Sequence, residues 1–127
     1  MLLFTLGVAG SGFAAGPSVP ALPTTGVNLP RDSGGWLNVA VRSHRMVIAF
    51  FDGQKVPVAP DRRHGLVQYQ QVTRGIHRTS LRFSRDGRRL VSPTRIDPPD
   101  EFLVNLALFN DGADEGTETH EFFYHAP

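Results

Sequence analysis

Hydrophobic side chains alternate with polar ones over short stretches after Gly34, and this period of two residues constrains the fold most strongly. Successive side chains of a strand point to opposite faces of a sheet, so the alternation predicts strands with one buried face. No window of about 11 residues carries a helical stripe of apolar side chains. Strands are therefore expected at residues 36–42, 45–52, 66–72, 77–84, 89–92, 102–109 and 117–124.

Turn residues between these stretches support the same interpretation. Asp86-Gly87 lies between two apolar-rich stretches and predicts a hairpin, and Asp52-Gly53 has the same turn chemistry. Pro98-Pro99 prevents a helix before the sixth stretch. Short strands at this spacing predict an all-β fold, namely an antiparallel immunoglobulin-like β-sandwich of about seven short strands. Because the chain has no cysteine, the Cys…Trp…Cys signature is missing, and "immunoglobulin-like" describes the architecture only.

The alternation also predicts which side chains form the core. Nine apolar residues occupy the expected inward positions of the strands, and all nine should be buried. The predicted core consists of Val39, Val41, Ile48, Phe50, Leu81, Phe83, Val104, Leu106 and Leu108.

The first residues have the layout of an export signal. Residues 1–15 are an apolar run that ends in small residues, which predicts a signal peptide cleaved after Ala14 or Ala15. No Lys or Arg precedes the run, which is unusual for a signal peptide, so an uncleaved anchor or a part of the fold are the alternatives. The run is too short for a transmembrane helix, which needs about 20 apolar residues. We therefore expect a periplasmic or secreted protein with no transmembrane span after processing.

A Pro/Gly-rich stretch at residues 16–34 follows and predicts a linker. The remaining residues, 35–127, are enough for one β-sandwich domain. The absence of cysteine excludes a thiolate nucleophile and a cysteine metal site.

Charge is distributed unevenly along the chain. Residues 62–95 contain nine Arg and one acid, Asp86, whereas residues 96–127 contain eight acids and no Lys or Arg. Either the two segments neutralise each other within the fold, or one of them is a partner surface. Arg85, Arg88 and Arg89 crowd the predicted hairpin tip, and we expect them to bind an anion or a partner there.

Metal sites are the second hypothesis. His120 and Glu118 share a face of the last predicted strand, so a surface metal site is conceivable, although no cofactor is expected. Residues 110–116 are acidic and Gly-rich, and oxygen ligands at this spacing could hold Ca²⁺. A solvated hairpin loop explains the same residues.

Motifs of catalysis and nucleotide binding are absent from the sequence. It has no Gly-x-Ser-x-Gly elbow, no Walker pattern and no Gly-x-Gly-x-x-Gly. The predicted arginine face has no accompanying aromatic residues for base stacking, so we expect no nucleic acid partner. The interpretation is therefore a protein that is not an enzyme.

Several segments resemble those of small exported bacterial β-sandwich proteins, a loosely defined and mostly uncharacterised group. The similar segments are MVIAFFDGQKVPVAP (46–60), GLVQYQ (65–70), FSRDGRRLVSP (83–93) and FLVNLALF (102–109) with the final aromatic strand. These are turn and core positions, so the resemblance implies a fold and an export route and no site residues.

Together these observations predict an exported, non-enzymatic β-sandwich that acts as a binding or accessory module of the bacterial envelope. Its expected partner is an envelope protein or an anionic surface. The alternative is a periplasmic metal-binding protein that uses His120 with nearby carboxylates.

Overall fold

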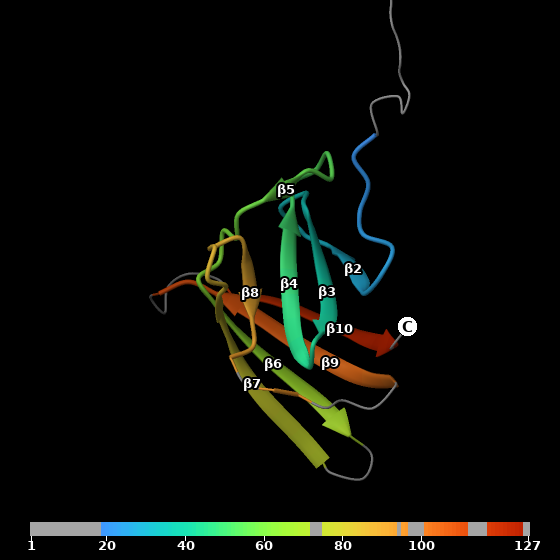
Figure 1. The fold of residues 1–127 in the computed structure, drawn as a ribbon, viewed down its shortest axis with the longest axis vertical. Helices are drawn as coiled ribbons and strands as arrows, with labels where there is room; N and C mark the ends of the chain where they lie inside the picture. The colour runs from blue at the N-terminus through green and yellow to red at the C-terminus, as the bar shows by residue number, and fades with distance from the viewer. Residues whose placement is uncertain (1–18, 72–74, 94, 97–100, 112–116, 126–127) are drawn as a thin grey trace, which may run out of the picture.

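The computed structural model describes residues 19–71, 75–93, 95–96, 101–111 and 117–125. These residues form nine strands and no helix, and all strand pairs are antiparallel, which confirms the predicted all-β class (Figure 1). None of the described residues forms a helix that could span a membrane. The strands are β2 (Val27–Pro30), β3 (Trp36–Arg42), β4 (Arg45–Phe51), β5 (Pro57–Val58), β6 (His64–Gln71), β7 (Gly75–Phe83), β8 (Arg89–Val91), β9 (Glu101–Phe109) and β10 (Glu118–His125).

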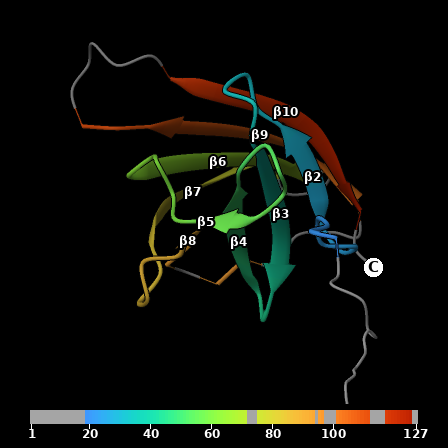
Figure 2. The ribbon, with the colours of Figure 1, turned by 90° about the horizontal axis from the view of Figure 1, so that it is seen from above.

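The strands follow one another in a single curved sheet of order β10-β9-β6-β7-β8-β4-β3-β2, with β5 paired to β4. Strand β7 belongs to both halves of this sheet, because it pairs with β6 along Gly75–Leu81 and with β8 at Arg82 and Phe83. The sheet thereby curls until β10 and β2 approach each other (Figure 2). The fold is a nearly closed, barrel-like sheet, and it is not clearly divided into the two sheets of the expected seven-strand sandwich.

Strand β2 and the two-residue strand β5 were not expected from the sequence. Strand β2 lies within the segment 16–34 expected to be a linker, and it pairs with β3 from Val27↔Val39 to Pro30↔Trp36. Proline is tolerated at a strand end on the edge of a sheet, so Pro30 closes the strand without preventing it. The paired part of the chain therefore begins at Val27, ahead of the expected boundary at residue 35.

The core lies inside the curved sheet and contains most of the predicted residues. Seven of the nine expected core residues are buried, and Val41 is half-buried. Phe83 is 41 % exposed, which corrects the prediction for this residue. Phe83 is the last residue of β7 and directly precedes a turn. At a strand end, an inward-pointing side chain can lack a neighbouring side chain that buries it.

The predicted β7–β8 hairpin is confirmed. The Gly87 amide donates to the Ser84 carbonyl at 2.9 Å, and Gly87 has a φ of 72°, which glycine adopts without steric cost. The Asp86 carboxylate accepts hydrogen bonds from the Ser84 hydroxyl at 2.6 Å and the Arg88 amide at 3.0 Å. The turn that carries the predicted anion-binding residues is thus held by its own hydrogen bonds.

A side chain of the outer strand β10 joins it to β3, the neighbour of the other outer strand β2. The Val41 amide of β3 donates to the Tyr124 hydroxyl of β10 at 3.0 Å. Val41 lies two residues beyond Val39, where the pairing of β3 with β2 stops. A tyrosine hydroxyl therefore takes the place that a strand carbonyl would occupy in a closed barrel. We call this junction between β10 and the β2–β3 hairpin the seam.

Candidate functional site

Arg31 directly follows β2 and lies at one end of the seam. Its side chain is only 5 % exposed, and its guanidinium carbon lies 5.1 Å from the centre of the Phe50 ring, a cation–π distance. A buried charge is costly unless it is paired, so its partners decide whether this arrangement is stable.

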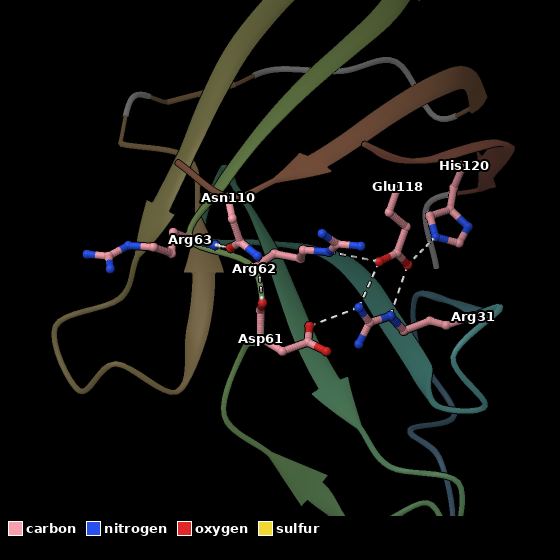
Figure 3. Close-up of polar contacts among 7 residues, drawn as sticks. All are labelled: Arg31, Asp61, Arg62, Arg63, Asn110, Glu118 and His120. Atoms are coloured by element: carbon pink, nitrogen blue, oxygen red, sulfur yellow. Dashed lines mark hydrogen bonds and ion pairs between the residues drawn. The ribbon is translucent and has the colours of Figure 1, made fainter. Parts of the chain in front are cut away.

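Those partners are two carboxylates from distant parts of the chain (Figure 3). Arg31 Nε donates to Glu118 Oε2 at 2.9 Å, and Arg31 Nη2 donates to Glu118 Oε1 at 2.7 Å. This is a two-point guanidinium–carboxylate pair, the strongest common geometry. Arg31 Nη2 also donates to Asp61 Oδ1 at 2.9 Å.

Glu118 is the centre of the group. Arg62 Nε lies 3.4 Å from Glu118 Oε1, and His120 Nε2 lies 2.8 Å from Glu118 Oε2. Burial alone would raise the pKa of Glu118, but the hydrogen bonds from Arg31 and His120 lower it to about 2. We call Arg31, Asp61, Arg62, Glu118 and His120 the Arg31 cluster.

The expected metal ligands His120 and Glu118 are therefore neighbours, as the strand pattern predicted. However, both oxygens of Glu118 accept hydrogen bonds from Arg31, whose positive charge opposes a bound cation. No group of three or more His, Cys, Asp or Glu side chains within the described residues is placed to hold a metal ion. The contacts of these two residues thus favour a structural role at the seam.

The segment that carries Asp61 and Arg62 is also hydrogen-bonded to Asn110, which follows β9. The Arg63 amide donates to Asn110 Oδ1 at 2.9 Å, and Asn110 Nδ2 donates to the Asp61 carbonyl at 3.4 Å. The Arg63 side chain points away from the Arg31 cluster in Figure 3, and its Nε lies 3.3 Å from Asp111 Oδ2. Of the loop considered for Ca²⁺, only Asn110 and Asp111 lie within the described residues.

The charge halves of the chain do meet in part. Arg62 and Arg63 of the basic segment contact Glu118 and Asp111 of the acidic segment. Arg78 instead donates to Gln68 Oε1 at 3.0 Å, an amide on the neighbouring strand. Neutralisation within the fold therefore explains one end of the basic segment.

The other end of the basic segment has a different environment. Arg42, Arg85 and Arg89 border a surface hollow of about 500 Å³ whose apolar lining is Val47 and Val91. Arg88 and Arg89 border the next hollow, of about 520 Å³. We call these four arginines the basic face.

All four residues of the basic face are exposed. Their guanidinium groups make no hydrogen bond and no ion pair with any residue in the described ranges, although Arg88 and Arg89 lie near Asp86. The Asp86 carboxylate is already used by the turn, since the Ser84 hydroxyl and then the Arg88 amide are the main causes that lower its pKa. Arg42 was not among the expected site residues, because only the pairing of β3 with β4 and of β4 with β8 brings it near the hairpin.

Sequence reasoning missed the Arg31 cluster apart from Glu118 and His120. Arg31 lies 87 residues from Glu118, and a single arginine after a proline gives no local signal of an ion pair. Comparison with known proteins finds no family model, no curated protein and no solved structure that matches this chain.

Proposed function

We propose that the chain is an exported, non-enzymatic module of the bacterial envelope that binds an anionic partner through Arg85, Arg88 and Arg89. The export part of the proposal is supported by the apolar run at residues 1–15, which lies outside the described residues. An immunoglobulin-like architecture of the sheet is part of the same proposal.

One contrast supports the anion-binding role. Arg31, Arg62 and Arg63 pair with carboxylates of the fold, whereas the guanidinium groups of the basic face pair with none in the described part of the chain. A guanidinium offers several N–H donors in a planar fork that suits phosphate and carboxylate oxygens. Several such groups around one surface therefore attract an anion. The hydrogen bonds within the β7–β8 turn fix the backbone that carries Arg85 and Arg88.

Binding of polyphosphate tests this proposal. The double variant Arg85→Gln/Arg88→Gln should bind about 10- to 100-fold more weakly, since each cation near an anionic surface contributes on the order of 1 kcal/mol. Adding Arg89→Gln should weaken binding further. Raising the salt concentration should weaken the parent chain more than the variant, because salt screens exposed charges.

The matched control is Arg63→Gln/Arg78→Gln, which removes the same charge from exposed residues outside the basic face. This control should keep nearly the full affinity. If both double variants lose the same polyphosphate affinity, only net charge matters and the proposed site is wrong. If none of these substitutions changes polyphosphate affinity, the proposed site is also refuted.

A further inference from the structure

The end of the molecule that carries the hairpin tip also exposes apolar side chains. Val56 and Val58 are 41 % and 40 % exposed, and Val58 lies in β5, next to the turn that follows β4. Figure 1 shows β5 and the tip of the β7–β8 hairpin at the same end of the sheet. The hollow bordered by Arg88 and Arg89 is also lined by Pro57, Val58 and Ala59.

Cationic and apolar groups therefore border one hollow. Lys55, which is exposed, directly precedes Val56 in the same turn. The carboxylate of that turn, Asp52, accepts hydrogen bonds from the Gln54 and Val56 amides at 2.9 and 3.0 Å. The carboxylates of Asp52 and Asp86 thus accept hydrogen bonds from their own turns. The nearby cations Lys55, Arg88 and Arg89 are exposed to solvent.

This combination suits one kind of partner. A soluble polyanion uses the cations and leaves the valines in water. The surface of an anionic bilayer offers phosphates to the cations and, directly beneath them, apolar chains that cover the valines. The charge of the basic face is complementary to such a surface, and the two turns present both kinds of group at one end of the sheet.

We infer that this end of the molecule, formed by Lys55, Val56, Val58, Arg85, Arg88 and Arg89, docks on anionic lipid bilayers. The inference rests on the proposed anion-binding function and names its partner. The arginines supply attraction to the lipid phosphates, and Val56 and Val58 enter the interface between headgroups and acyl chains.

Co-sedimentation with vesicles of phosphatidylglycerol and phosphatidylcholine tests the inference. The parent chain should bind these vesicles and should bind vesicles of phosphatidylcholine alone at least 10-fold more weakly. Val56→Ser/Val58→Ser should reduce binding to the mixed vesicles about 3- to 10-fold and leave polyphosphate binding unchanged. The matched control is Leu66→Ser/Ile76→Ser, which alters side chains that are 41 % and 56 % exposed elsewhere on the sheet and should change neither.

A second variant makes the result independent of the stability of the serine variant. Tryptophan at position 56 (Val56→Trp) should show a blue-shifted emission with mixed vesicles after subtraction of the parent spectrum, because its ring leaves water. Polyphosphate binding without vesicle binding would overturn the bilayer inference and leave the proposed function intact. If the parent chain binds neither polyphosphate nor vesicles, both the bilayer inference and the proposed function are overturned. Equal vesicle binding by the two serine variants, or no blue shift, would also overturn the docking surface.

Discussion

Replacing Glu118 by Gln tests the role of the Arg31 cluster most directly. The substitution keeps the shape of the side chain but removes its charge. The Arg31 side chain is only 5 % exposed, and Asp61 is its other carboxylate partner within the described residues. The Asp61 side chain is 61 % exposed. The perturbation therefore leaves a buried guanidinium with one partner that water can screen.

The structure gives the size of the expected effect. The pKa of Glu118 falls from 4.5 to about 2, because its hydrogen bonds to Arg31 and His120 outweigh the opposing effect of burial. At about 1.4 kcal/mol per pKa unit, this difference corresponds to roughly 3 kcal/mol. Breaking a buried ion pair by removing one partner typically costs about 3–5 kcal/mol, and more exposed pairs cost less. We expect a loss of about 2–4 kcal/mol in the free energy of unfolding for Glu118→Gln.

The assay is urea unfolding at pH 7, followed by the fluorescence of Trp36, the single tryptophan of the chain. The same experiment at lower pH tests the cause. Because the folded-state pKa lies below the unfolded-state pKa, the stabilisation is fully present above about pH 5 and is lost as the pH falls towards 2. The difference between the parent and Glu118→Gln should therefore shrink over that range.

Glu121→Gln is the matched control, since Glu121 lies on the same strand and is exposed. It should change stability by less than about 0.5 kcal/mol. The reasoning is refuted when Glu118→Gln unfolds at the same urea concentration as Glu121→Gln, or when its deficit stays constant from pH 7 to pH 3.

Two further substitutions examine the core and the seam. Leu106→Ala removes a side chain that is 1 % exposed and should cost about 2–5 kcal/mol in urea unfolding, and a cost below about 0.5 kcal/mol would contradict its position in the core. Tyr124→Phe keeps the buried ring and leaves the Val41 amide without its acceptor, so it should cost about 1–3 kcal/mol, and faster hydrogen exchange at Val41 than in the parent would confirm the cause.

The local pattern of the sequence predicted most of the strands because strands such as β7, β9 and β10 bury one face more fully than the other. At residues 102–109 every second side chain was expected to point inward, and these side chains are buried in the strand Glu101–Phe109. The Asp86-Gly87 pair predicted its hairpin because glycine at positive φ is a local requirement. Strand β2 was missed, because four residues between prolines and glycines hold too little alternation to be recognised.

The curvature of the sheet could not be predicted in the same way. Strand β7 changes its partner between Leu81 and Arg82, and nothing in the residues of β7 marks that point. The Arg31 cluster and the basic face have the same origin. Arg31 meets Glu118 only after the sheet has closed around its core, and Arg42 comes near Arg89 only after β3, β4 and β8 have paired. The hairpin arginines were found because they are neighbours in sequence, whereas the exposed valines proposed to dock with them, Val56 and Val58, come from another turn.

The seam also has a consequence for the order of events in folding. Its two side-chain contacts join residues that are 83 and 87 positions apart in the chain, whereas the β3–β4 and β7–β8 hairpins close over a few residues. Contacts between distant residues pay their loop-closure entropy before they contribute, so they form late on the folding pathway. A contact that is absent from the transition state affects the unfolding rate and leaves the folding rate nearly unchanged. We therefore expect that replacing Glu118 or Tyr124 speeds the opening of the closed sheet between β10 and β3 and leaves its folding rate nearly unchanged.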